Sequence, residues 1–458
     1  SPRYIMRPVP ARTPRLARAR LLLLSLAACE PRGGPPTPAQ TSRAPDGPTL
    51  RSRTRPAVRS CPATHKPQTV KIDPRIELGE AAGVTWLFGY ADSDAVLAHL
   101  GADGGLAPFT KVPLHNAQAG AVAGAKIWLY APRESDTVPT RWTAIDVSDP
   151  DAPVVGPVVP VKTGAKHDYA QMLAVDARRA LVIVGFADDS ELVLLDPSTH
   201  TAIAPPHPLG RGFEPVHAMC ADDRCAVVGV TDEGGGPDRR LVVIRVLADG
   251  TSEQELLAPG WIGQPHAAEH GDQFLVTWTD DDGLNLRALD LWGRPAGPVT
   301  PVPWARDLRN DTLLHADGIV MLAVGERGRW DIAALGPNTT PGPFRELPGA
   351  RGYFLVGAPL GDGLAWVNVD GDVSHDEMGP VMTHSWHSRA IGGFLPTEGA
   401  PTQQDLASGS DGGRGGFQAY ILTRPGAAAA LVVPRDDAMN FHQPVFAPLR
   451  APCGAGAP

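Results

Sequence analysis

The stretch that decides the fold starts at residue 181. It consists of an apolar run, Leu181-Val182-Ile183-Val184, a polar turn, Ala187-Asp188-Asp189-Ser190, and a second run, Glu191-Leu192-Val193-Leu194-Leu195-Asp196. Short runs rich in β-branched and large apolar residues on either side of a polar turn predict a β-hairpin. Both runs are too short for a stable helix, and no other window of the chain shows the period of a long amphipathic helix.

The same unit recurs along the chain. Apolar runs start at residues 86, 127, 181, 226, 274, 319, 364 and 420, so successive starts lie 41 to 56 residues apart. A period near 45 residues that holds about four short strands predicts an all-β fold, a β-propeller of seven or eight four-stranded blades over residues 68–453. The Gly/Ser-rich stretch 396–416 leaves the number of blades open. A pair of β-sandwich domains is the alternative, which the uniform spacing disfavours.

This period and hairpin pattern resembles β-propellers of the WD40-like or quinoprotein-like kind. The chain has no Gly-His…Trp-Asp signature, no kelch double-Gly pattern and no repeated Ala-Trp docking motif. The resemblance therefore implies the fold, and it implies no particular ligand or reaction.

The first 29 residues predict an export signal. A basic stretch at residues 12–20 precedes the apolar run at 21–26, which is too short to span a bilayer, and small residues follow. Its end, Leu26-Ala27-Ala28-Cys29, resembles the lipobox of bacterial lipoproteins. That resemblance implies cleavage before Cys29 and a diacylglyceryl thioether on its sulfur, and Glu30 then favours the outer membrane of a Gram-negative cell. An ordinary cleaved signal with an incidental cysteine is the alternative.

Residues 30–67 are rich in Pro, Arg, Ser and Thr without an apolar period, which predicts a disordered tether. Residues 454–458 are expected to form a disordered tail. We therefore expect an exported protein that is lipid-anchored to the cell envelope, with the membrane as its first partner.

The propeller region is strongly acidic. Residues 1–67 hold 13 of the 41 basic and 2 of the 50 acidic residues, so the remainder carries 28 basic and 48 acidic residues, a net charge of −20. This charge disfavours nucleic acid and anionic membrane surfaces, and it is compatible with cations or a basic partner. Added solubility is the simpler interpretation.

The cysteines fit an oxidising compartment. With Cys29 lipidated, four remain. Cys220 and Cys225 flank a short turn, where opposed hairpin positions lie within disulfide reach. Cys61 and Cys453 flank the repeat array, so a bond between them would fasten the two ends of a closed ring. The alternatives are four reduced thiols or a metal site.

Three histidines are candidate site residues. His167, His217 and His266 precede apolar runs of consecutive blades and lie 50 and 49 residues apart, about one blade each. Equivalent blade positions converge on the ring axis, so we expect these side chains at one channel mouth, able to bind a transition metal or to act as acid and base. Inert polar residues of the connecting loops are the alternative.

The segment 368–376 is a candidate calcium site. Asn368, Asp370, Asp372 and Asp376 place oxygen ligands at alternate positions around an inner glycine, although the order differs from the EF-hand pattern. Ordinary turn chemistry is the alternative.

Two functions of different classes remain open at this stage. One is a tethered binding or scaffold module for a protein or glycan ligand. The other is an exported propeller enzyme, a hydrolase, lyase or oxidoreductase, with a His-lined site in its central channel. The usual catalytic strings are missing, among them Gly-x-Ser-x-Gly, His-Glu-x-x-His and the phosphate-binding Gly-Lys-Ser/Thr loop, which favours the binding module.

Overall fold

The computed structural model describes residues 60–453, except for short segments at 64–65, 136, 167–168, 186–188, 211, 233–238, 259, 261, 264, 271–272, 304–309, 317–318, 327–328, 337–338, 351–353, 379–380, 398–399, 412–415 and 436–442. The predicted signal peptide, Cys29, most of the tether and the C-terminal tail lie outside this range. The described residues form strands, turns and loops without an α-helix.

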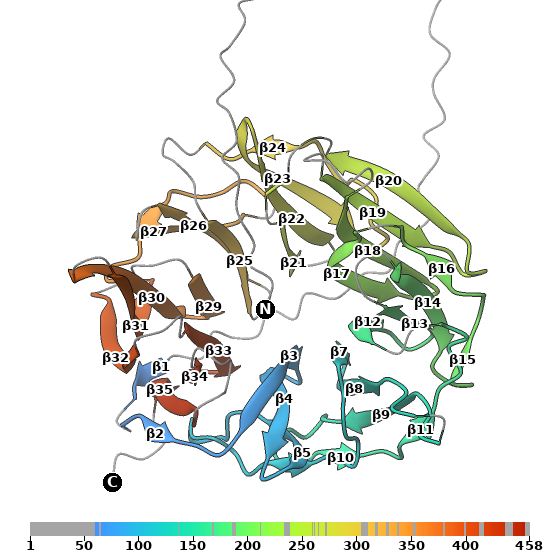
Figure 1. Ribbon diagram of the computed structural model, residues 1–458, viewed down its shortest axis with the longest axis horizontal. Helices are drawn as coiled ribbons and strands as arrows, with labels where there is room; N and C mark the ends of the chain where they lie inside the picture. Colours follow the sequence, from blue (N-terminus) through green and yellow to red (C-terminus); the bar gives the residue numbers. More distant parts are fainter. Residues whose placement is uncertain are drawn as a thin grey trace, which may run out of the picture. The chain divides into compact units, whose positions relative to one another are not determined.

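The strands form eight antiparallel sheets, each with four main strands, arranged as blades around a ring (Figure 1). The first four blades are β3 (Asp73–Ala81), β4 (Val84–Ala91), β5 (Asp94–Ala98) and β6 (Thr110–Lys111) in blade 1; β7 (Ala119–Ala123), β8 (Lys126–Ala131), β9 (Arg141–Asp146) and β10 (Val154–Val155), with β11 (Val159–Pro160), in blade 2; β12 (Ala170–Val175), β13 (Ala180–Val184), β14 (Glu191–Asp196) and β15 (Thr201–Ala202), with β16 (His207–Pro208), in blade 3; and β17 (Glu214–Ala221), β18 (Arg224–Thr231), β19 (Arg240–Val246) and β20 (Ser252–Ala258) in blade 4.

The remaining blades repeat this order. They are β21 (His266–His270), β22 (Gln273–Asp280), β23 (Gly283–Asp290) and β24 (Thr300–Pro301) in blade 5; β25 (Asn310–Ala316), β26 (Ile319–Glu326), β27 (Arg329–Ala334) and β28 (Arg345–Glu346) in blade 6; β29 (Phe354–Leu360), β30 (Gly363–Met378), β31 (Val381–Pro396) and β32 (Thr402–Asp411) in blade 7; and β33 (Gly416–Arg424), β34 (Ala427–Arg435), β35 (Val445–Pro452) and β1 (Ser60–Pro62), with β2 (Gln68–Thr69), in blade 8.

The first strand of every blade lies at the centre of the ring. These inner strands follow one another around the axis of the ring (Figure 1) in the order β3, β7, β12, β17, β21, β25, β29 and β33. Because neighbouring strands are antiparallel, all inner strands begin on one face of the ring, together with the turns between second and third strands. We call this the start face, and the other, which carries the first-to-second and third-to-fourth connections, the end face.

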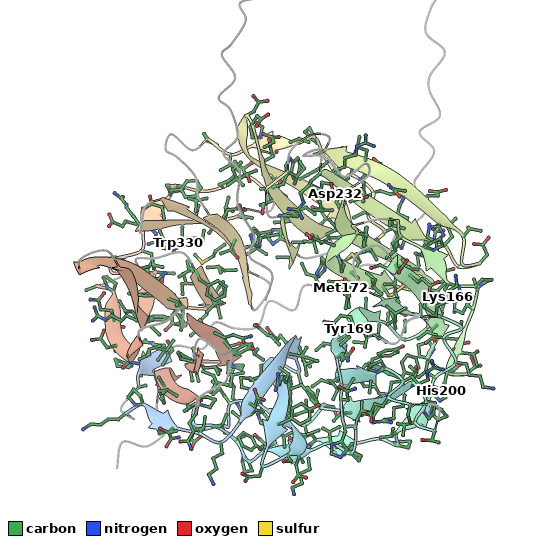
Figure 2. All side chains as sticks on the ribbon, viewed as in Figure 1. Lys166, Tyr169, Met172, His200, Asp232 and Trp330 are labelled. Carbon is green, nitrogen blue, oxygen red and sulfur yellow. A yellow bond between two sulfur atoms is a disulfide. The ribbon has the colours of Figure 1, made fainter. Side chains whose placement is uncertain are left out.

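The all-β propeller prediction is confirmed, with eight blades. The predicted apolar runs are mostly second strands, and these are buried on both sides. In β13, Leu181 and Ile183 pack toward blade 4, whereas Val182 and Val184 pack toward blade 2. This double burial explains why the run is continuously apolar rather than alternating. One buried apolar cluster lies at each of the eight blade interfaces, and Figure 2 shows the side chains on the ring of blades.

The last apolar run departs from the pattern. The run at residue 420 lies in the inner strand β33, not in a second strand. Blade 7 is also longer than the others, since β30 and β31 pair over 16 residues. The length of blade 7 explains the wide last spacing of 56 residues, although the run at residue 420 lies one strand earlier in its blade. Part of the Gly/Ser-rich stretch, Thr402–Asp411, forms β32.

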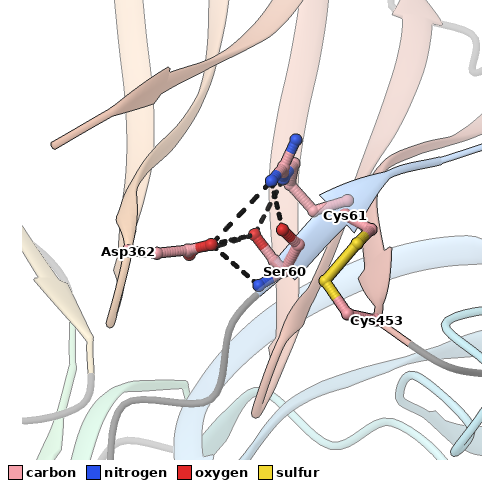
Figure 3. The surroundings of a disulfide bond; sticks show 5 residues. Ser60, Cys61, Asp362 and Cys453 are labelled. Atoms are coloured by element: carbon pink, nitrogen blue, oxygen red, sulfur yellow. Dashed lines mark hydrogen bonds and ion pairs between the residues drawn. A yellow bond between two sulfur atoms is a disulfide. The ribbon is translucent and has the colours of Figure 1, made fainter. Parts of the chain in front are cut away.

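The ring closes in blade 8, where the N-terminal strand β1 pairs with the C-terminal strand β35. The predicted disulfide between Cys61 and Cys453 is confirmed, with Cα atoms 5.0 Å apart (Figure 3). Residues 60–62, which the sequence assigned to the tether, are thus the fourth strand of this blade. The second predicted disulfide, Cys220–Cys225, is also confirmed and joins directly opposed residues of the β17–β18 hairpin.

A polar cluster supports the closure next to the disulfide (Figure 3). The Ser60 amide and hydroxyl donate to the carboxylate of Asp362, at 2.7 Å from the amide, in the β29–β30 turn of blade 7. Arg450 of β35 donates to the Ser60 hydroxyl at 2.8 Å and lies over the Phe394 ring. We call Ser60, Asp362 and Arg450 the seam cluster. It ties β1 to two blades.

Candidate functional site

The two predicted histidines that the structure describes lie on neighbouring inner strands. His217 lies in β17 and pairs with Val228, the fifth residue of β18. His266 begins β21 and pairs with Thr277, the fifth residue of β22. The two therefore occupy the same register position in blades 4 and 5. His167 lies outside the described residues, so the predicted group of three stays a prediction.

Both histidines are partly buried, and one ring nitrogen of His217 is sealed. The Nε2 atom of His217 is sealed from solvent and has no hydrogen-bond partner among the described residues, and its ring lies 5.9 Å from that of Phe274. Burial lowers the pKa of His217 to about 4, so the ring is neutral near pH 7. Because its Nε2 atom is sealed, this nitrogen offers nothing to a ligand in the channel.

His266 lines a cavity of about 520 Å³ on the start face, between blades 4 and 5. Glu214, the first residue of β17, and Arg239, just before β19, also line this cavity and form an ion pair. The other lining residues are Pro215, Val216, Val230, Pro265 and Ala267. We call this cavity the start-face pocket. Its lining thus combines an ion pair and a histidine with five apolar residues.

The local sequence explains how Glu214 reaches the pocket. Gly229 of β18 has no side chain, and a Cβ atom there would lie 2.3 Å from the ring of Phe213. Phe213 therefore packs against the sheet and directs the chain into β17. The pairing of β17 with β18 then shifts by one residue between Pro215 and His217, a β-bulge that re-aims the side chains beyond it.

Burial shifts the pKa values of His266 and of Asp311 in the next blade. It lowers the pKa of His266, which favours the neutral imidazole. The Thr277 hydroxyl, opposite His266 in the sheet, donates to the Asp311 carboxylate of blade 6 at 3.0 Å. Burial raises the pKa of Asp311 to about 6 despite this hydrogen bond. Thr277 and Asp311 thus form a buried polar contact across the interface between blades 5 and 6.

The segment proposed for calcium has an unexpected backbone. It lies within β30 and pairs residue by residue with β31, for example Asp370 with Arg389 and Asp372 with His387. The expected turn is therefore wrong, since an extended strand does not wrap around an ion. The Asn368 amide is buried and donates to the Phe354 carbonyl at 3.0 Å. The side chains of Asp370, Asp372 and Asp376 lie outside the described part, so calcium binding stays a prediction.

The described residues offer no site at which three or more His, Cys, Asp or Glu side chains could hold a metal ion. No helix within the described range is long and apolar enough to cross a membrane. Sequence reasoning missed Arg239 and Asp311. Neither has a sequence signal, because the fold alone brings each to its partner.

No protein family and no curated protein matches this chain in sequence. Solved propeller structures resemble it at low identity. AztD from Citrobacter koseri is 12% identical, with a TM-score of 0.44 over 78% of this chain and 94% of AztD. The β-propeller domain of the trilobed protease from Pyrococcus furiosus, described as having an open velcro topology, is 12% identical, with a TM-score of 0.40 over 74% and 96%.

A prolyl endopeptidase structure is 13% identical, with a TM-score of 0.41 over 83% of this chain and 54% of the endopeptidase. The chain thus spans about half the length of that enzyme. At such identities these likenesses concern the fold alone.

Proposed function

We propose that this protein is a lipid-anchored, extracytoplasmic β-propeller that acts as a binding module, with its ligand in the start-face pocket. The ligand is a protein or glycan of the envelope rather than nucleic acid, since the propeller region is acidic. The lipobox-like Leu26–Cys29 supports the anchor. The two disulfides support an oxidising compartment.

The make-up of the pocket lining carries the binding proposal. Among the described residues that line it, none is a Ser, Thr, Cys or Lys that could serve as a nucleophile. Arg239, Glu214 and His266 are instead donors and acceptors that fix the orientation of a polar ligand above apolar contacts. A neutral His266 suits recognition by hydrogen bonding at either ring nitrogen.

The enzyme alternative has one observation in its favour. His266 has its pKa lowered by burial and lines the same cavity as the Glu214 carboxylate, so it could accept a proton from a bound substrate. The Nε2 atom of His217 gives no such support, because it is sealed from solvent.

Thermal-shift measurements on the purified protein test the site. The probes are muropeptides, soluble envelope glycans and short peptides. A ligand of this site raises the melting temperature of the wild type. The increase is smaller in Arg239→Ala and in His266→Gln. Product formation from a probe, lost in His266→Gln, would support the enzyme instead. No stabilisation by any probe would count against the binding role.

Labelling tests the anchor. Cells that express the full chain are grown with a palmitate analogue and fractionated. We expect label on the wild type and both label and membrane attachment to be lost in Cys29→Ala. Equal membrane attachment of the two proteins contradicts the anchor and leaves the pocket proposal standing.

A further inference from the structure

A second cavity lies on the end face, away from the start-face pocket. It measures about 430 Å³ and is bounded by the long β5–β6 connection of blade 1 and the β9–β10 connection of blade 2. Arg424, at the end of β33 in blade 8, joins these two connections. It donates to the Leu100 carbonyl and, through two nitrogens at 3.1 and 3.3 Å, to both carboxylate oxygens of Asp151.

The connection from blade 1 is ordered by its own hydrogen bonds. The Gly101 amide donates to the Gly105 carbonyl at 2.8 Å, and the Ala107 amide donates to the His99 carbonyl at 3.0 Å. The Asp103 carboxylate accepts the Gly105 amide at 2.9 Å. With the Arg424 bonds, these contacts hold the cavity wall in one shape, which lowers the entropy lost on binding a ligand.

His99 lies at the floor of this cavity and is only 2% exposed. Its Nδ1 atom pairs with the Leu100 carbonyl at 2.9 Å, and its ring lies on Trp86 with centroids 4.3 Å apart. The pairing with a carbonyl makes Nδ1 the protonated nitrogen, so Nε2 carries a lone pair. No hydrogen bond within the described structure uses Nε2, and Nε2 is not among the sealed atoms, so the cavity is where it finds a partner.

The chemistry of the cavity wall defines the ligand. The wall offers acceptors, namely Nε2 of His99 and the free oxygen of Asp103, whereas the Arg424 cation is occupied by Asp151. Leu106, Phe109 and Pro153 add apolar contacts. A metal ion is disfavoured, since no group of three ligating side chains is found among the described residues. Acceptors and one uncompensated carboxylate beside apolar walls suit a cation with a carbon skeleton.

We propose that this end-face cavity is a second ligand site, independent of the start-face pocket, and that it takes an organic ammonium ion. The ammonium group donates a hydrogen bond to Nε2 of His99 and lies beside the carboxylate of Asp103. Its carbon skeleton packs on Phe109, Leu106 and Pro153. The acidity of the propeller region adds a long-range attraction for the same charge.

Calorimetric titration of the full chain with benzylammonium chloride tests this site. The uncharged analogue benzyl alcohol measures the contribution of the charge. Nα-acetyl-lysine amide tests whether the ammonium group of a polypeptide lysine is accepted equally well. Tighter binding of this amide assigns the site to lysine side chains, and tighter binding of benzylammonium assigns it to small amines. Either result supports the ammonium site.

Three variants locate the binding. Asp103→Asn keeps an oxygen for the Gly105 amide but removes the charge, and we expect it to weaken benzylammonium binding about 10-fold. His99→Phe keeps the ring on Trp86 but removes Nε2, with a loss of similar size. The matched control is Asp249→Asn, since Asp249 accepts the Thr251 amide in the equivalent connection of blade 4; it leaves the affinity unchanged.

Three results would overturn the proposal: no binding of benzylammonium, equal binding of benzyl alcohol, or equal affinity in the wild type and Asp103→Asn. If His99→Phe does not fold, Asp103→Asn alone decides, because it preserves the turn.

Discussion

The seam of the ring and the sector formed by blades 4 and 5 are stabilised in different ways. At the seam, β1 is fastened by a disulfide and by the seam cluster, in which every polar group has a partner. The sector of blades 4 and 5 is continuous in sequence, yet it contains half of the sealed side-chain atoms that lack a hydrogen-bond partner among the described residues. These atoms belong to His217, Asp232, His270, Trp278 and Trp292.

From this difference we infer that the seam provides stability and that the sector of blades 4 and 5 provides function. A seam joins chain ends that are far apart in sequence, so its closure has a large entropic cost and needs strong local bonds. A continuous sector has no such cost and tolerates unsatisfied polar groups, which proteins keep mostly where a site requires them. The start-face pocket lies in the second region. The comparison therefore predicts that seam variants lose stability, whereas pocket variants lose binding.

The seam disulfide should give the largest effect. Replacing Cys61 and Cys453 by Ser removes a cross-link over 392 residues, which loop-closure theory values at about 6 kcal/mol, with smaller values common in practice. Urea unfolding followed by tryptophan fluorescence measures the loss. A change below about 1 kcal/mol would show that strand pairing and the seam cluster close the ring without help.

His217, whose Nε2 atom is sealed in the other region, should make the protein sensitive to acid. His217 has a pKa of about 4 in the folded protein, below the usual 6.5, so below pH 6.5 the unfolded chain binds a proton that the folded chain does not. Stability is thus lost as the pH falls from 6.5 to 4, by about 3 kcal/mol from this group.

His217→Phe keeps the contact with Phe274 and cannot titrate. We expect it to reduce the difference in unfolding free energy between pH 7 and pH 4 by about 3 kcal/mol. His207→Phe, at an exposed histidine of β16, is the control and should follow the wild type. Identical pH profiles for the wild type and His217→Phe would mean that His217 is not a source of acid sensitivity.

The hairpin disulfide sharpens the comparison, since it differs from the seam disulfide mainly in loop length. Cys220 and Cys225 lie five positions apart in sequence and already face each other in a continuous hairpin. Their joint replacement by Ser should lower the unfolding free energy by about 2 kcal/mol, well below the seam value. Equal losses for the two double variants would show that closure entropy is not what distinguishes the seam.

The sequence predicted the features that follow from the repeat. It failed for the features that depend on contacts between residues far apart in sequence. The run 181–184 identified the second strands because these are buried on both sides. The spacing of His217 and His266 placed them at one register position, but it did not show that Nε2 of His217 is sealed, which depends on packing against Phe274 of the next blade. The Asp-rich segment in β30 reads as a turn, and only its pairing with β31 makes it a strand.

The smallest expected effect comes from a pair of matched carboxylate substitutions. Glu214 forms its ion pair with Arg239 on the start face, and its side chain is 71% exposed. Exposed ion pairs contribute little to stability, because solvent screens them and the side chains lose freedom in forming them. Glu214→Gln should therefore change the unfolding free energy by no more than about 0.5 kcal/mol, while it reduces ligand stabilisation in the thermal-shift assay.

Asp362→Asn makes the same loss of charge at the seam. Asp362 accepts both the amide and the hydroxyl of Ser60 and lies 3.8 Å from the Arg450 guanidinium. An asparagine turns one acceptor into a donor that faces other donors, so we expect a loss of about 2 kcal/mol. Urea unfolding of the two variants side by side measures the contrast. If Glu214→Gln destabilises the protein as much as Asp362→Asn, the start-face ion pair stabilises the fold as the seam cluster does. That result would contradict the division between a seam that provides stability and a pocket that provides binding.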